Sequence, residues 1–108
     1  MKRLALLLPL LALGCGQPVP EDKSHYVGQW SGAGMRLEIT AEGRVEYERL
    51  KPGKVTISAP IQSFEGDDFL VGLPYLTTRF SVSQPPHRDG EHWKMVVDGV
   101  ELVRAASR

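Results

Sequence analysis

The sequence predicts an all-β domain: an antiparallel up-and-down meander of seven or eight short strands that forms a small barrel or a curled two-layer sheet. Two observations predict it. Apolar and polar residues alternate along most of the chain, as in strands with one buried face. The runs are separated by turn-forming pairs, which are Glu42-Gly43, Pro52-Gly53, Glu65-Gly66, Asp89-Gly90 and Asp98-Gly99.

The alternation predicts the strands in order. They are expected around Trp30 and at residues 35–39, 45–47, 55–61, 69–73, 78–82, 93–97 and 100–103. The Asp98-Gly99 pair before the last strand is favoured in type I′ hairpin turns. The predicted core consists of Trp30, Leu37, Ile39, Val45, Ile57, Phe69, Val71, Phe80, Val82, Trp93, Met95 and Leu102.

No segment has an apolar stripe at helical spacing for three turns, so a long helix is not expected. Without a helix to cover it, the apolar face of the sheet must be buried against the sheet itself. Consecutive strands with short loops pair as antiparallel neighbours, which favours a meander. Alternation places Arg79 on the outer face, because its neighbour Phe80 points inward.

The N-terminus has the features of an export signal. Lys2 and Arg3 precede ten apolar residues, 4–13, and small residues flank Leu13 just before Cys15. Ten apolar residues are too few to cross a bilayer, which needs about 20. A basic start, a short apolar run and small residues at its end are typical of a cleaved signal peptide.

The segment Leu11-Ala12-Leu13-Gly14-Cys15 resembles the lipobox of bacterial lipoproteins. The resemblance implies a diacylglyceryl group on Cys15, cleavage before it by signal peptidase II, and acylation of the new N-terminus. It departs from the family at Ala12, where leucine is commonest. Gly16 stands where an aspartate would indicate inner-membrane retention, so the resemblance implies the outer membrane, facing the periplasm. The alternative makes Cys15 a buried or reactive thiol of an ordinary secreted protein.

Three segments follow from this interpretation: a signal peptide (1–14), a lipid-anchored tether (15–25) and a small β-barrel domain (26–108). Removal of residues 1–14 takes away two of the 13 basic residues and none of the 13 acidic ones, so the net charge falls from zero to about −2. A mildly negative net charge does not favour nucleic-acid binding, which needs clustered Lys and Arg on the surface. We therefore expect no nucleic-acid partner.

Tyr26-Val27-Gly28-Gln29-Trp30 is similar to the start of lipocalins and fatty-acid-binding proteins, in which a G-x-W on the first strand closes one end of an up-and-down barrel. The resemblance gives Gly28 and Trp30 a structural role, and implies that a basic residue of the last strand, here Arg104, packs on the tryptophan. The domain is shorter than those barrels. An eight-stranded barrel holds its own side chains or one small ligand, and we expect a filled interior. Residues 93–104 are also similar to small uncharacterised proteobacterial lipoproteins.

Candidate chemistry is sparse. The sequence has one cysteine, no G-x-S-x-G motif and three histidines, of which His25 ends the tether. The segment 87–92 (HRDGEH) offers the weak metal candidates His87, Asp89 and His92. Because Pro-Pro precedes it and Asp-Gly is central, we interpret it instead as a hairpin loop. We expect no cofactor, no metal and no enzymatic activity.

Two functions remain. The first is a non-catalytic interaction module of the cell envelope, held on the membrane by the anchor at Cys15, which binds another envelope protein or a cell-wall component through its outer surface or loops. The alternative is a lipocalin-like carrier of a small hydrophobic ligand.

Overall fold

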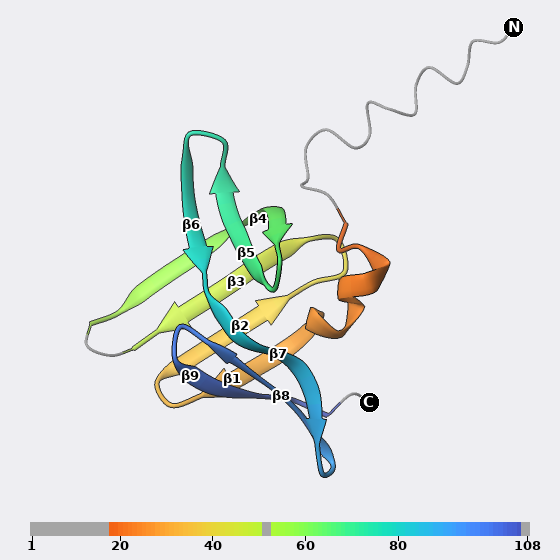
Figure 1. The fold of residues 1–108 in the computed structure, drawn as a ribbon. Coiled ribbons are helices and arrows are strands. Elements are labelled where there is room, and N and C mark those ends of the chain that lie inside the picture. The colour runs from red at the N-terminus through yellow and green to blue at the C-terminus, as the bar shows by residue number, and fades with distance from the viewer. Residues whose placement is uncertain (1–17, 51–52, 107–108) are drawn as a thin grey trace, which may run out of the picture.

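The computed structural model describes residues 18–50 and 53–106. Cys15 and the expected signal peptide lie outside these residues. A short 3₁₀ helix, η2 (Glu21–Tyr26), precedes the strands (Figure 1). The strands are β1 (Gly28–Gly32), β2 (Met35–Ile39), β3 (Arg44–Arg49), β4 (Val55–Glu65), β5 (Asp68–Leu73), β6 (Leu76–Phe80), β7 (Val82–Asp89), β8 (His92–Val97) and β9 (Val100–Arg104).

The predicted all-β antiparallel meander is confirmed. The described strands form one curled sheet in the order β6-β5-β4-β3-β2-β1-β9-β8-β7. Pairing of β1 with β9 joins the two ends of the domain, and the two edges of the sheet are β6 and β7. The sheet is therefore a curled, open barrel.

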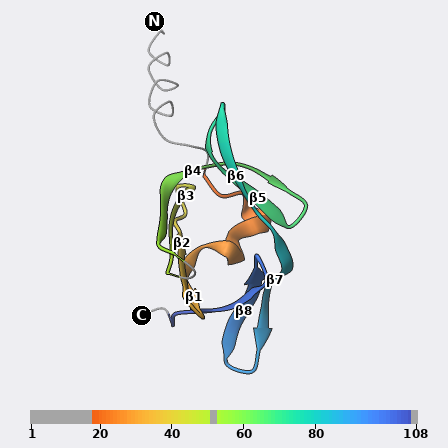
Figure 2. The ribbon, with the colours of Figure 1, turned by 90° about the vertical axis from the view of Figure 1, so that its left-hand side faces the viewer.

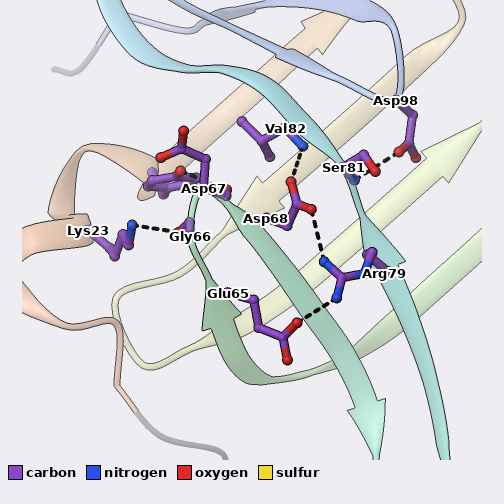
Figure 3. Close-up of polar contacts among 10 residues, drawn as sticks. Lys23, Glu65, Gly66, Asp67, Asp68, Arg79, Ser81, Val82 and Asp98 are labelled. Atoms are coloured by element: carbon purple, nitrogen blue, oxygen red, sulfur yellow. Dashed lines mark hydrogen bonds and ion pairs between the residues drawn. The ribbon is translucent and has the colours of Figure 1, made fainter.

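The structure has nine described strands where the sequence predicts seven or eight, because the strand expected at 78–82 is divided at Ser81. The Ser81 N–H donates to the Asp98 carboxylate (3.0 Å), and the Val82 N–H donates to the Asp68 carboxylate (2.8 Å) (Figure 3). These carboxylates take the place of a neighbouring strand. The chain can then leave β5 and pair with β8.

Two layers result from this change of partner. Figure 2 shows β1 to β4 on one side, β5, β7 and β8 on the other, and η2 between them. The long strand β4 also belongs to both layers, because its first half pairs with β3 and its second half with β5, with an irregularity between Ile61 and Ser63. Bends of this kind let a sheet fold over itself.

The core lies between the two layers. All the predicted core residues are buried except Ile57 and Trp93, which are partly buried and pack against the core. Trp93 is the second residue of β8, next to the turn, and is less buried than Met95 and Val97 further along the strand. Tyr26 of η2 adds a buried side chain that alternation did not predict, and its ring meets Phe64 and Phe69 edge-on.

The described part of the expected tether packs on the domain instead of extending away from it. The Val19 N–H donates to Ala41 O (3.0 Å), and Lys23 Nζ donates to Gly66 O (2.9 Å). η2 ends at Tyr26, whose hydroxyl donates to Asp67 O (2.8 Å). Burial, with the nearby charges of Asp67 and Asp68, raises the pKa of Tyr26 to about 12.

We predict that Asp68→Asn lowers the melting temperature at neutral pH by roughly 4 to 8 °C, the usual effect of one lost hydrogen bond in a domain of this size. The Val82 N–H, with help from Arg79, holds the pKa of Asp68 below its ordinary value. The stabilisation is therefore complete above the unfolded pKa of about 3.9 and is lost as the pH falls through the folded pKa. Thermal unfolding between pH 7 and pH 2 should show the two proteins converging in acid.

Asp67→Asn is the matched control, since Asp67 receives the Tyr26 hydroxyl through its backbone oxygen, which the substitution keeps. Equal effects of the two substitutions at neutral pH would contradict a special role for Asp68.

Candidate functional site

An aromatic and cationic cluster lies where η2 meets strands β8 and β9. We call it the Trp93 rim and define it as His25, Arg88, Trp93 and Arg104. These residues come from η2, β7, β8 and β9, so the rim exists only in the folded chain. It lies above the buried Trp30, which is the strand partner of Arg104.

Arg104 lies between two indole rings. Its guanidinium carbon is 5.7 Å from the Trp30 ring centre and 5.0 Å from the Trp93 ring centre. Nη1 also donates to the backbone oxygens of His25 (3.3 Å) and Val27 (3.4 Å). A guanidinium at this distance is attracted to the negative face of the indole. The contact with Trp30 is the one that the lipocalin resemblance implies for Arg104.

Gly28 makes room for this arginine. A Cβ at Gly28 would lie 2.6 Å from Arg104 Cδ, and the backbone there has φ +147°, which side chains disfavour. The glycine of the G-x-W motif is therefore required by the crossing of Arg104 over β1.

Trp93 is the centre of the rim. The His25 ring stacks on it with centroids 4.4 Å apart and an interplanar angle of 16°. The Arg88 guanidinium carbon is 5.8 Å from its ring centre, because Arg88 and Trp93 are strand partners in the β7–β8 hairpin. Two guanidinium groups thus lie beside one partly buried indole.

Neither guanidinium of the rim forms an ion pair within residues 18–50 and 53–106. Arg88 donates only a long hydrogen bond, 3.4 Å, to Gly90 O. An open concavity of about 630 Å³ is lined by three residues of the rim, Arg88, Trp93 and Arg104. Ser31, Glu91 and His92 are among its other lining residues. One carboxylate therefore faces two permanently charged guanidinium groups. Such a surface can hold an anionic group next to an apolar ring.

The weak metal candidates are not gathered into a site. His87 and Asp89 lie in β7 and His92 begins β8, so they belong to strands and not to the expected loop. His87 Nδ1 is 2.9 Å from Pro85 O, and Asp89 accepts a hydrogen bond from Lys94 Nζ (3.1 Å), which lowers the pKa of Asp89. Among the described residues, no three His, Cys, Asp or Glu side chains come together as metal ligands.

Sequence reasoning missed His25 and Arg88. His25 is at the end of the expected tether, and only η2 brings it to Trp93. Arg88 had a detectable signal: a two-residue turn at Gly90-Glu91 makes positions 88 and 93 cross-strand partners. The irregular pairing of β7 before His87, around Pro85-Pro86, obscured the strand.

Comparisons with family models, with curated proteins and with solved structures find no match to this chain. In the described part of the chain, no helix is long and apolar enough to cross a bilayer.

We predict that Gly28→Ala lowers the free energy of unfolding by about 1–3 kcal/mol, the cost of holding a side chain in a disfavoured backbone conformation. It should also change tryptophan emission, because Arg104 must move from Trp30 and Trp93. Denaturant unfolding followed by tryptophan fluorescence measures both effects.

Gly53→Ala is the control for this prediction, since a Cβ at Gly53 meets no atom within 4 Å. Its effect should stay within about 0.5 kcal/mol. A Gly28→Ala protein as stable as the Gly53→Ala protein would show that the Arg104 crossing tolerates a side chain.

Proposed function

We propose that this chain is a lipid-anchored, non-catalytic interaction module of the cell envelope. The anchor is Cys15, and the proposed location is the outer membrane, facing the periplasm. The basic start, the short apolar run and the lipobox-like segment 11–15 support the anchor, and Gly16 after Cys15 supports the outer-membrane location. Two or more acyl chains hold a protein on a membrane where a single chain gives only marginal binding.

The binding surface that we propose is the Trp93 rim, and the ligand class is a carboxylate-bearing partner, such as a cell-wall component or an envelope protein. One observation carries this proposal: Arg88 and Arg104 both lie against Trp93, and neither is in an ion pair within the described residues. Arginine binds carboxylates through two parallel hydrogen bonds, and an adjoining ring adds apolar contact.

The guanidinium groups and the indole of the rim are suited to binding a ligand. Guanidinium groups stay protonated, and an indole has no acid–base function near neutral pH. Arg88, Trp93 and Arg104 therefore support a binding role for the rim. A lipocalin-like carrier would need an empty interior, whereas the inward positions hold large buried side chains such as Trp30, Phe69 and Phe80.

We expect the protein from the host membrane fraction to lack residues 1–14 and to carry acyl chains on Cys15. Intact mass spectrometry of the detergent-extracted protein measures this directly. Cys15→Ser should prevent the modification and release the protein from the membrane. A Cys15→Ser protein that stays lipidated and membrane-bound would refute the anchor.

We expect Arg88→Gln to weaken binding of carboxylate-bearing ligands by roughly 10- to 150-fold, since a hydrogen bond to a charged group is worth about 1.5–3 kcal/mol. Calorimetric titration with oligogalacturonate and with cell-wall peptides that end in free carboxylates tests this. The matched control is Arg36→Gln, an exposed arginine on the outer face of β2.

Neutral oligogalactose should not bind measurably. Equal binding of the neutral and acidic sugars, or equal losses in the Arg88→Gln and Arg36→Gln proteins, would remove the rim as the binding surface.

A further inference from the structure

The β5–β6 hairpin extends beyond the curled sheet and ends in an exposed apolar tip. We define the tip as Leu73, Pro74, Tyr75 and Leu76. Leu73 is 46% exposed, Tyr75 81% and Leu76 72%. The turn lies at Pro74-Tyr75, and Leu73 pairs with Leu76. Figure 1 shows the hairpin standing clear of the other strands.

The hairpin carries no charged residue between Asp68 and Arg79. From Phe69 to Thr78 the sequence contains ten residues without a single Asp, Glu, Lys, Arg or His. The nearest charges are at its base, where Arg79 binds Asp68 (2.9 Å) and Glu65 (Figure 3). The tip can therefore leave water without desolvating an ion, while the charged base remains hydrated.

The tip lies at the same end of the molecule as the start of the described chain. In both Figures 1 and 2, the first described residues and the β5–β6 turn are at the upper end, and the β7–β8 turn is at the lower end. Pro18 is three residues after Cys15, a distance that an extended chain covers in at most about 11 Å. An anchor at Cys15 holds this end of the domain close to the bilayer.

We infer that the tip inserts into the surface of the bilayer that holds the Cys15 anchor. This inference rests on the proposed lipidation. Leu73 and Leu76 are apolar and Tyr75 has an aromatic ring with a polar end, and both kinds of side chain suit the boundary between headgroups and acyl chains. The four residues from Arg79 to Tyr75 span about 13 Å of strand, enough for the 5–10 Å depth of interfacial insertion.

The insertion is shallow for a structural reason. β6 is an edge strand, so its outer backbone groups have no strand partner among the described residues and need water. Only the turn and its first strand pair can enter the bilayer. The two attachments, lipid and tip, then orient the domain with the Trp93 rim pointing away from the membrane.

A fluorescent probe at the tip tests this inference in the full-length lipidated protein. Acylated Cys15 has no free thiol and is the only cysteine of the sequence, so Tyr75→Cys creates one labelling site. An environment-sensitive dye at position 75 should shift to shorter wavelength on phosphatidylethanolamine–phosphatidylglycerol vesicles. Lipids spin-labelled near the headgroup should quench it. The same dye at Glu91→Cys, in the β7–β8 turn, should remain in water and unquenched.

Leu76→Ser, added to the protein labelled at position 75, should lower the ratio of protected to exposed probe roughly tenfold, the effect of removing one large apolar side chain from the buried state. Val55→Ser is the matched control, because Val55 is 47% exposed at the start of β4, outside the tip. It should leave the ratio unchanged.

The possible outcomes test the lipid anchor and the insertion of the tip separately. A protein that lacks acyl mass and does not float with vesicles overturns the anchor, and the tip assignment with it. A protein that is acylated and floats, but whose probe at position 75 stays in water, overturns the tip assignment alone. Protection that appears in native envelope membranes and not in protein-free vesicles also overturns it, and assigns the tip to a protein partner.

Discussion

The structure depends on one constraint: a one-sided antiparallel sheet with no long helix must bury its apolar face on itself. The domain does so at two places. β1 pairs with β9, which joins the first and last described strands, and the chain changes layers at Ser81. At Ser81 the backbone N–H groups are bound by Asp68 and Asp98, so the crossing leaves no buried donor without a partner. The pairing of β1 with β9 also brings Arg104 to Trp30, and this contact is the foundation of the Trp93 rim.

The same folding separates two surfaces with different chemistry. The rim combines two guanidinium groups with indole and imidazole rings, while the β5–β6 tip is apolar and uncharged. The charged cluster of Arg79, Asp68 and Glu65 marks the boundary at the base of the hairpin. A cationic and aromatic surface suits an anionic partner in water, and an apolar tip suits a lipid phase. The two proposals therefore use different hairpins of the domain, and both figures show the β5–β6 turn and the β7–β8 turn at opposite ends.

Most of the fold could be predicted because alternation is local. The period-two pattern of residues 35–39 and 93–97 is visible in the sequence, and the Asp98-Gly99 pair, with φ of 50° and 80°, forms the positive-φ turn that its residues favour. The division at Ser81 could not be predicted, because the carboxylates that cause it are 14 and 17 residues away from their N–H partners. Alternation also does not show where a hairpin passes the edge of the opposite layer, so it did not predict the exposed tip at Leu73 and Leu76. The candidate site was predicted only in part, through Gly28, Trp30 and Arg104. His25 reaches Trp93 through tertiary packing, and the irregular pairing around Pro85-Pro86 obscured the strand that places Arg88 beside Trp93.

The central claim is that the domain has one end on the membrane and one end directed away from it. Paramagnetic relaxation enhancement of backbone amides, measured on the lipidated protein in nanodiscs that contain spin-labelled lipid, tests this claim most directly. The account predicts the largest enhancements at Tyr75 and Leu76 and near Val19, and the smallest at Glu91 and Trp93. Uniform enhancement along the chain, or a maximum at the β7–β8 turn, would contradict it.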